Sequence, residues 1–184
     1  MRQQSLRIFL SVFLIGVSFL SPIFGYDRHN IFLGASVGAD FLLQDRKLSQ
    51  GSFEWGLYGG YEYKPLKIIG IMAYLESLMA FKPLGIQTQI INQIGLNADV
   101  SLEIITSEHF RTGPYMGIGI GYINQQSAVF DTESISQVAL LINGGWQMSI
   151  DESNIVRLGV KSSLGFGERA NRFLHFMLSY AYRF

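Results

Sequence analysis

FLHFMLSYAYRF, residues Phe173 to Phe184, is the stretch that decides the fold. Successive side chains of a β-strand point to opposite faces, so a strand here has two very different faces. One face is wholly apolar or aromatic: Leu174, Phe176, Leu178, Tyr180, Tyr182 and Phe184. The other face is mixed: Phe173, His175, Met177, Ser179, Ala181 and Arg183. The pattern predicts a strand whose apolar face is covered by something other than water.

The same alternation occurs in seven earlier segments: 31–41, 53–63, 67–79, 89–104, 114–123, 135–148 and 155–166. Segments of this length with period-two patterning are typical of transmembrane strands. Pro65 and the run Asp151-Glu152-Ser153-Asn154 indicate turns, and 106–112 is a polar connection. The alternate connections, 42–52, 80–88, 124–134 and 167–172, are somewhat longer. The sequence therefore predicts eight antiparallel strands joined in chain order.

Composition shows few charges and gives no electrostatic case for a nucleic-acid partner, while a soluble periplasmic barrel stays open until the interior volume is considered. Charged residues make up 15% and aromatic residues 14% of the 184 residues, and the formal net charge is zero. There is no cysteine, which excludes disulfides and thiolate metal sites. Arg2 and Arg7 precede an uncharged, mostly apolar run at 8–20, the pattern of a cleavable secretory signal. We expect a signal peptide over 1–25 and one β-barrel domain over 26–184.

The volume of a small barrel decides which face points inward. An eight-stranded barrel has an interior just wide enough to be filled by side chains. It cannot hold the large residues of the apolar face, such as Trp55, Trp146 and Phe176, in addition to many Leu and Ile. Ten strand residues rise about 33 Å, and a tilt of about 40° reduces this to roughly 25 Å, the height of the apolar band in membrane barrels. The apolar face is therefore expected to contact lipid.

The same assignment turns several charged side chains into the barrel. Buried charges require partners, so we expect a network of ion pairs and hydrogen bonds that plugs the interior. The expected network is Asp40, Glu54, Glu62, Glu76, Asp99, Glu103, Arg157, Lys161 and Arg183. The alternative is a narrow polar path for ions, which an eight-stranded lumen disfavours.

Other motifs carry weaker signals. Gly117-Ile118-Gly119-Ile120-Gly121 lacks the spacing of a phosphate-binding loop, and narrow-barrel packing explains it better. Three histidines, at 29, 109 and 175, are too scattered to predict a metal site, and no cofactor is expected. If the last two strands pair, inward Ser163 lies near inward His175, and Ser and His with an acid are the minimum for acyl transfer. No enzyme motif surrounds them, so catalysis is not the expected role.

The terminal strand resembles the closing strand of Gram-negative outer-membrane β-barrels, in which a final Phe with alternate aromatics is read by the barrel assembly machinery. The resemblance implies that Tyr180, Tyr182 and Phe184 form this assembly signal. The whole region 26–184 resembles the eight-stranded OmpA/OmpX-like class. The implied protein is monomeric and structural or surface-interacting, located in the outer membrane. Its expected partners are outer-membrane lipids, lipopolysaccharide and a host or surface ligand at the loops. The alternatives are a lipid A-modifying hydrolase or acyltransferase and a minor narrow pore.

Overall fold

The computed structural model describes residues 29–44, 47–48, 51–66, 68–84, 87–127, 135–166 and 171–184. The expected signal segment 1–25 lies outside these residues, as do parts of the expected longer connections. Eight long strands carry the fold: β1 (His29–Gln44), β3 (Ser52–Leu66), β4 (Ile69–Leu84), β5 (Gln87–Leu102), β7 (Phe110–Ser127), β8 (Ile135–Ile150), β9 (Asn154–Gly165) and β10 (Arg172–Arg183). Two short strands, β2 (Lys47–Leu48) and β6 (Ile105–Thr106), extend hairpins at opposite ends.

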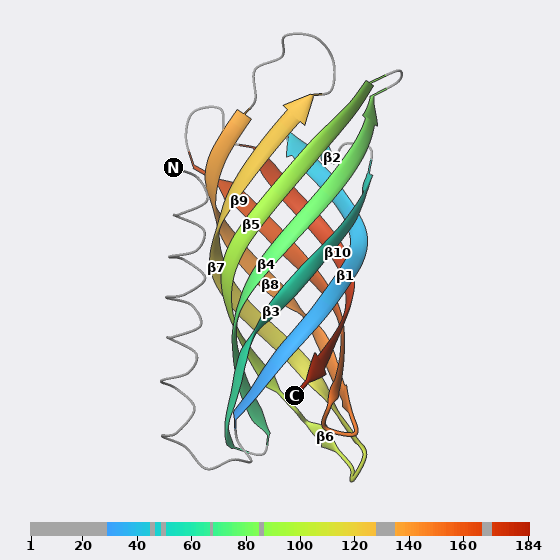
Figure 1. Ribbon diagram of the computed structural model, residues 1–184, viewed down its shortest axis with the longest axis vertical. Coiled ribbons are helices and arrows are strands. Elements are labelled where there is room, and N and C mark those ends of the chain that lie inside the picture. The colour runs from blue at the N-terminus through green and yellow to red at the C-terminus, as the bar shows by residue number, and fades with distance from the viewer. Residues whose placement is uncertain are drawn as a thin grey trace.

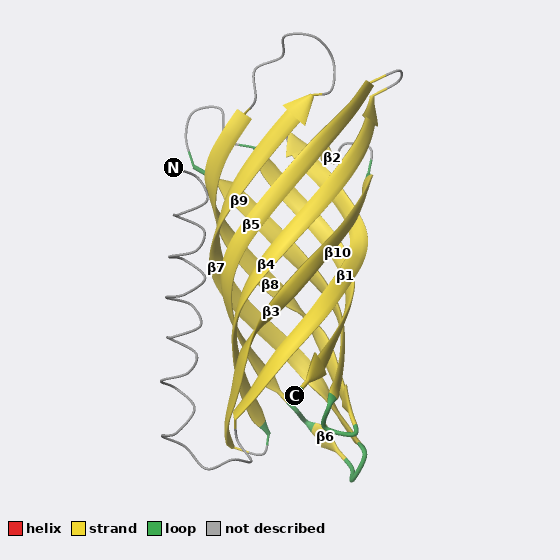
Figure 2. Ribbon diagram, in the orientation of Figure 1, coloured by secondary structure: helices red, strands yellow, loops and turns green. Residues whose placement is uncertain are grey.

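The eight long strands close into one antiparallel barrel. Each pairs with its neighbour in chain order, and β1 pairs with β10 from Phe32↔Arg183 to Leu43↔Arg172. Figures 1 and 2 show tilted strands wrapping a closed surface, with the C-terminus and β6 near the same end. Closure leaves no long strand edge unpaired, which satisfies the backbone without water. The predicted eight-stranded up-and-down barrel is confirmed.

Several predicted connections were too long, including 42–52 and 106–112, parts of which lie in strands. The segment 80–88 was expected to be a loop, but β4 continues to Leu84 and β5 begins at Gln87. The next expected loop, 124–134, loses its first residues to β7, which ends at Ser127. Paired hydrogen bonds satisfy backbone groups whatever the side chains are, so polar residues extend a hairpin beyond its apolar part. Polarity therefore marked the end of the apolar band rather than the end of the strand.

Among the described residues there is no helix long and apolar enough to cross a membrane.

The outer surface of the barrel is a belt of exposed apolar side chains. Met116 is 70% exposed, Leu158 64% and Leu178 51%, all within long strands. Aromatic residues sit on the same surface: Trp55, Trp146, Phe176, Tyr180, Tyr182 and Phe184. Soluble proteins rarely expose contiguous apolar patches beyond a few hundred square ångströms, whereas this surface surrounds the molecule. The belt agrees with the lipid-facing assignment, which was made from the interior volume of an eight-stranded barrel.

The interior contains large apolar residues that were not predicted to form a core. One buried cluster lies toward the end with the C-terminus: Phe32, Tyr58, Met72, Tyr74, Ile155 and Ala181. A second lies toward the other end: Ala80, Ile91, Ile123, Ala139, Leu141 and Phe173. Buried charges and amides occupy the space between and beyond them. The interior is thus filled in layers rather than lined only with small and charged residues.

Inward glycines of β7 create the space for neighbouring polar side chains. A Cβ built on Gly117 would overlap Asp99 Oδ1 and lie 2.5 Å from the Ala98 carbonyl oxygen. A Cβ on Gly119 would lie 2.6 Å from Asn97 Oδ1. The glycine run therefore admits the acid and amide of β5, in line with the packing interpretation.

Gly117→Ala is expected to destabilise the barrel by about 1–3 kcal/mol, because the added methyl overpacks a site that is already full. Gly144 is the matched control, since a Cβ added there would meet nothing closer than the Tyr115 carbonyl oxygen at 3.8 Å. Unfolding of both variants by urea in the same lipid vesicles measures the difference. Equal stabilities for the two variants would show that the inward glycines are not there to make space.

Candidate functional site

The polar interior of the barrel is the candidate site. All nine charged residues expected to point inward are buried, each at most 4% exposed. Four of the six carboxylates face an Arg or Lys. The pairs are Asp99 with Arg157, Glu76 with Lys161, Glu62 with Arg183, and Glu103 with Lys64 and more distantly Arg111. Glu54 and Asp40 instead face His175.

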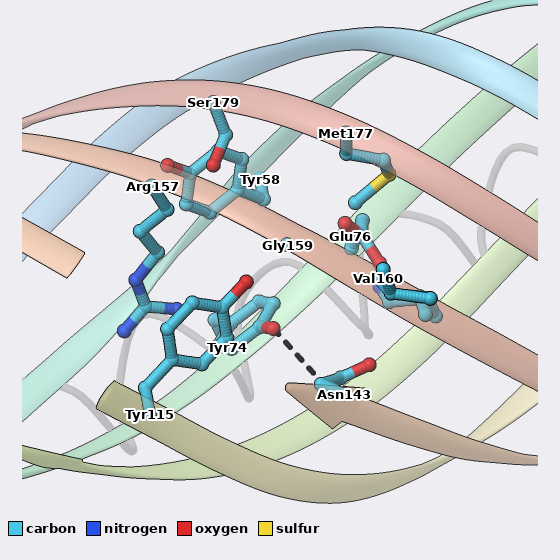
Figure 3. A pocket seen from close by; sticks show the side chains of 11 residues that line it. Tyr58, Tyr74, Glu76, Tyr115, Asn143, Arg157, Gly159, Val160, Met177 and Ser179 are labelled. Carbon is cyan, nitrogen blue, oxygen red and sulfur yellow. Dashed lines mark hydrogen bonds and ion pairs between the residues drawn. The ribbon is translucent and has the colours of Figure 1, made fainter. Parts of the chain in front are cut away.

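Arg157 is the centre of the middle layer. Its Nη1 donates to Asp99 Oδ2 at 2.8 Å and its Nε donates to Gln147 Oε1 at 2.8 Å. Its guanidinium lies over the Tyr115 ring, 4.5 Å from the centroid, as Figure 3 shows. A planar guanidinium can pair with a carboxylate and stack on an aromatic face at once, which a Lys cannot. The layer is therefore built around an arginine.

Asp99 receives further hydrogen bonds that hold it against Arg157. The Tyr74 hydroxyl donates to Asp99 Oδ2 at 2.9 Å, and Asn143 Nδ2 lies 2.9 Å from Oδ1. The same amide lies 3.1 Å from Asn97 Oδ1. A buried carboxylate with one cation and two neutral donors is well compensated. Tyr74, Asn143 and Arg157 come from β4, β8 and β9, and Figure 3 shows the contact of Tyr74 with Asn143.

The cavity beside this layer is small. It measures about 20 Å³ and is lined by Tyr58, Tyr115, Arg157, Lys161 and Ser179 among others. A cavity needs at least roughly 10–15 Å³ to hold one water. This cavity therefore has room for about one water.

A second polar cluster bridges three strands where the barrel closes. His175 of β10 faces Asp40 of β1 in the closing register, and Glu54 comes from β3. His175 Nδ1 lies 2.6 Å from Glu54 Oε2 and 3.5 Å from Asp40 Oδ1. His175 Nε2 lies 3.0 Å from Ser163 Oγ. The structure thus brings together Ser163, His175 and two acids.

The hydrogen bonds of this cluster do not favour a serine nucleophile. Ser163 Oγ donates to Gln93 Oε1 at 2.8 Å, so its one proton is used away from the imidazole. Activation by a histidine base requires the opposite, a serine hydroxyl that donates to the ring nitrogen. Ser163 is 0% and His175 2% exposed, and the Phe173 ring lies beside the imidazole. Because Ser163 and His175 are closed to solvent, an acyl substrate has no access to them.

The same cluster contains the residues that could hold a metal. One ligand atom each from Asp40, Glu54 and His175 lie within 4.8 Å of one another. No metal site was predicted from the sequence because the histidines are scattered along the chain. The combination of one histidine with two acids from other strands had no local signal in the sequence.

Two cations of the interior were also missed. Lys64 Nζ lies 2.9 Å from Glu103 Oε1, and Arg111 Nη1 lies 3.8 Å from Glu103 Oε2. Both residues lie near strand ends, where alternation weakens, so the pattern did not assign them to the interior. They complete the charge balance at the end of the barrel that holds the C-terminus.

No family model matches the chain, and comparison with curated protein sequences finds no match. Solved structures do match. The chain is similar to Neisserial surface protein A, at a TM-score of 0.63 and 11% identity, over 84% of this chain and 97% of that one. It is also similar to Ail, the attachment invasion locus protein of Yersinia pestis, at a TM-score of 0.54 and 17% identity, over 85% and 98% of the two chains. Ail has also been solved in complex with the heparin analogue sucrose octasulfate.

A third similar structure is the N-terminal β-barrel domain of Pseudomonas aeruginosa OprF, at a TM-score of 0.53 and 12% identity, over 83% of this chain and 97% of that one. At these identities the likeness establishes the fold. Fold and apolar belt together define an integral membrane β-barrel of the outer-membrane class. The protein is a small eight-stranded outer-membrane barrel with a filled, charge-compensated interior.

Proposed function

We propose that the protein is a monomeric structural and surface-interaction component of the outer membrane. The observation that carries this proposal is the filled interior. Arg157 and Lys161 cross the lumen to acids three and four strands away, Arg183 pairs with Glu62 two strands away, and two apolar clusters fill other parts of the interior. Such an interior supports a rigid plug and disfavours transport. Any binding of lipids or of a surface ligand then takes place at the lipid-facing surface or at the loops.

The proposed orientation places the connections at 45–46, 49–50, 85–86, 128–134 and 167–170 on the cell surface. In barrels of this class the turns on the periplasmic side are short, so the end with the turn at 151–153 is the proposed periplasmic end. Asn124 and Ser136 flank 128–134 and hydrogen-bond on the outside of the barrel, Nδ2 to Oγ at 3.1 Å. This polar pair suits the headgroup region of lipopolysaccharide, which is the lipid partner we propose. That the structurally similar Ail has been solved with a heparin analogue supports the proposal of a surface ligand.

The proposed function predicts no conductance and a defined topology. The conductance of planar bilayers containing the purified protein should remain at baseline, because the cavity of about 20 Å³ has no space for a hydrated ion.

An epitope tag within 128–134 should be labelled on intact cells, and a tag at 151–153 should not. Steady ion-selective channels would favour the pore alternative, and surface labelling at 151–153 would reverse the orientation.

A further inference from the structure

Four exposed apolar side chains surround two neighbouring turns at the end of the barrel that holds the C-terminus. Leu66 and Ile68 lie at the turn between β3 and β4, and Ile104 and Ile105 lie where β5 passes into β6, near the lower end in Figure 1. Each of the four is between 47% and 57% exposed. Scattered exposed apolar residues are ordinary, whereas a contiguous group marks a contact surface. We call these four residues the turn patch.

The turn patch is continuous with the apolar belt. The Glu103 N–H donates to the Ile68 carbonyl oxygen at 2.8 Å, which joins the two turns. Leu66 and Leu102, on the two strands that flank β4, both pair with Ile69. Leu102 is an exposed residue of the belt. The lipid-facing surface of β4 and β5 therefore runs without a break into the turn patch.

The height of the belt on β5 indicates what covers the turn patch. Asn92 is the last outward polar residue before an outward apolar run from Ile94 to Leu102, which is eight residue steps long. These steps rise about 26 Å along the strand and span roughly 20 Å at a tilt of about 40°. The apolar band of membrane barrels is about 25 Å tall, so the run falls short of it. The next outward residue, Ile104, adds the missing height, which places the turn patch at the edge of the hydrocarbon.

The surroundings of the turn patch also favour a membrane interface over a protein partner. Tyr61 and Tyr63 face outward on β3 just before it, and aromatic residues of this kind are enriched at membrane–water interfaces. Ser107, Glu108 and His109, at the tip of the next hairpin, are polar and exposed, so the apolar surface ends there. A standard protein interface buries about 800 Å² on each side and uses about 20–30 residues. Four half-exposed side chains fall well short of that.

We propose that the turn patch is inserted into the membrane, at the boundary between acyl chains and phospholipid headgroups, and holds this end of the barrel at a fixed depth. The polar tip at 107–109 then emerges into water. In the proposed orientation the leaflet is the periplasmic one, and that assignment rests on the proposed function. The insertion itself does not depend on which way the barrel faces.

Nitroxide labels on single cysteines test the insertion, because the sequence has no cysteine of its own. The labelled variants are Ile68→Cys and Ile105→Cys, with Leu178→Cys as the lipid reference and Glu108→Cys as the matched control in the polar tip. Each is refolded into phosphatidylcholine vesicles. EPR then measures how often the label collides with apolar oxygen and with a water-soluble nickel chelate. We expect the oxygen-to-nickel ratio at 68 and 105 to exceed the ratio at 108 and to approach the ratio at 178.

Two results would overturn the insertion. One is a ratio at 68 and 105 equal to that at 108, which would show that the turn patch lies in water. The other is a low collision rate with both reagents, which would show that protein covers the patch, and dipolar broadening between labels would identify a second copy. The substituted side chains are exposed, so folding should be kept, and the gel mobility of the folded barrel checks this. A reversed topology in the epitope-tag experiment would move the turn patch to the other leaflet and leave these ratios unchanged.

Discussion

We expect Leu178→Arg to lower the free energy of unfolding in lipid vesicles by about 2–4 kcal/mol, the cost of a cation near the bilayer midplane of a barrel. Leu178 lies in the middle of β10, between Val37 and Leu158 on the neighbouring strands, and is 51% exposed. Its environment is therefore hydrocarbon if the apolar belt faces lipid. Urea titration of the vesicle-bound barrel, followed by Trp fluorescence, measures the loss.

Ile150→Arg is the matched control for this effect. Ile150 is also outward and 40% exposed, but it is the last residue of β8, next to the turn at Asp151. Near the interface the same cation costs only about 0–1 kcal/mol. A small, equal loss for both variants would show that the surface around Leu178 is not in hydrocarbon, and the assignment of the two faces would fail.

We expect Arg157→Met to lower the free energy of unfolding by about 3–5 kcal/mol, because it leaves Asp99 as a buried charge without its cation. Met replaces the aliphatic part of the arginine side chain but can neither pair with the carboxylate nor donate to Gln147 Oε1, which lies 2.8 Å from Arg157 Nε in the wild type. The stacking over Tyr115 is lost as well. Thermal unfolding in detergent, read by the mobility shift of the folded barrel in gels, measures the change.

The double variant Arg157→Met with Asp99→Asn separates charge from packing. Asn at 99 can still accept from Tyr74 and carries no charge, so part of the stability should return relative to Arg157→Met alone. Residues in one buried network are expected to be non-additive in this way. If the double variant loses the sum of the two single losses, the ion pair is not what holds this layer.

Much of the architecture was predictable because strand alternation is a local signal. The alternation around Leu178 and Leu158 assigned the outward face, and both residues are exposed in the closed barrel. The turn predicted at Asp151 separates β8 from β9, whereas the turn predicted around Pro65 was wrong, because β3 continues through Pro65 to Leu66. At Asp151 and Glu152 the backbone takes φ values of 49° and 58°, in the left-handed region that tight turns use.

The pairings inside the barrel could not be predicted in the same way. Period two tells which side of a strand faces inward, but the stagger between strands sets which inward residues share a level. His175 of β10 is the direct strand partner of Asp40 of β1. It also contacts Glu54, which lies on β3 beyond β1 and is 121 residues away in the chain. Arg157 and Asp99 are 58 residues apart. The two apolar clusters were missed for the same reason, since each gathers one or two residues from several strands.

An apolar belt in lipid around an interior closed to water is the central claim, and one NMR measurement tests both parts. Methyl signals of Leu178 and Leu141 are recorded in bicelles, first with a spin label on the lipid chain and then with a water-soluble relaxation agent. Leu178 is 51% exposed and Leu141 0%. We predict that the lipid label broadens Leu178 and that neither agent broadens Leu141. Broadening of Leu141 by the water-soluble agent, or of Leu178 by that agent but not by the lipid label, would contradict the claim.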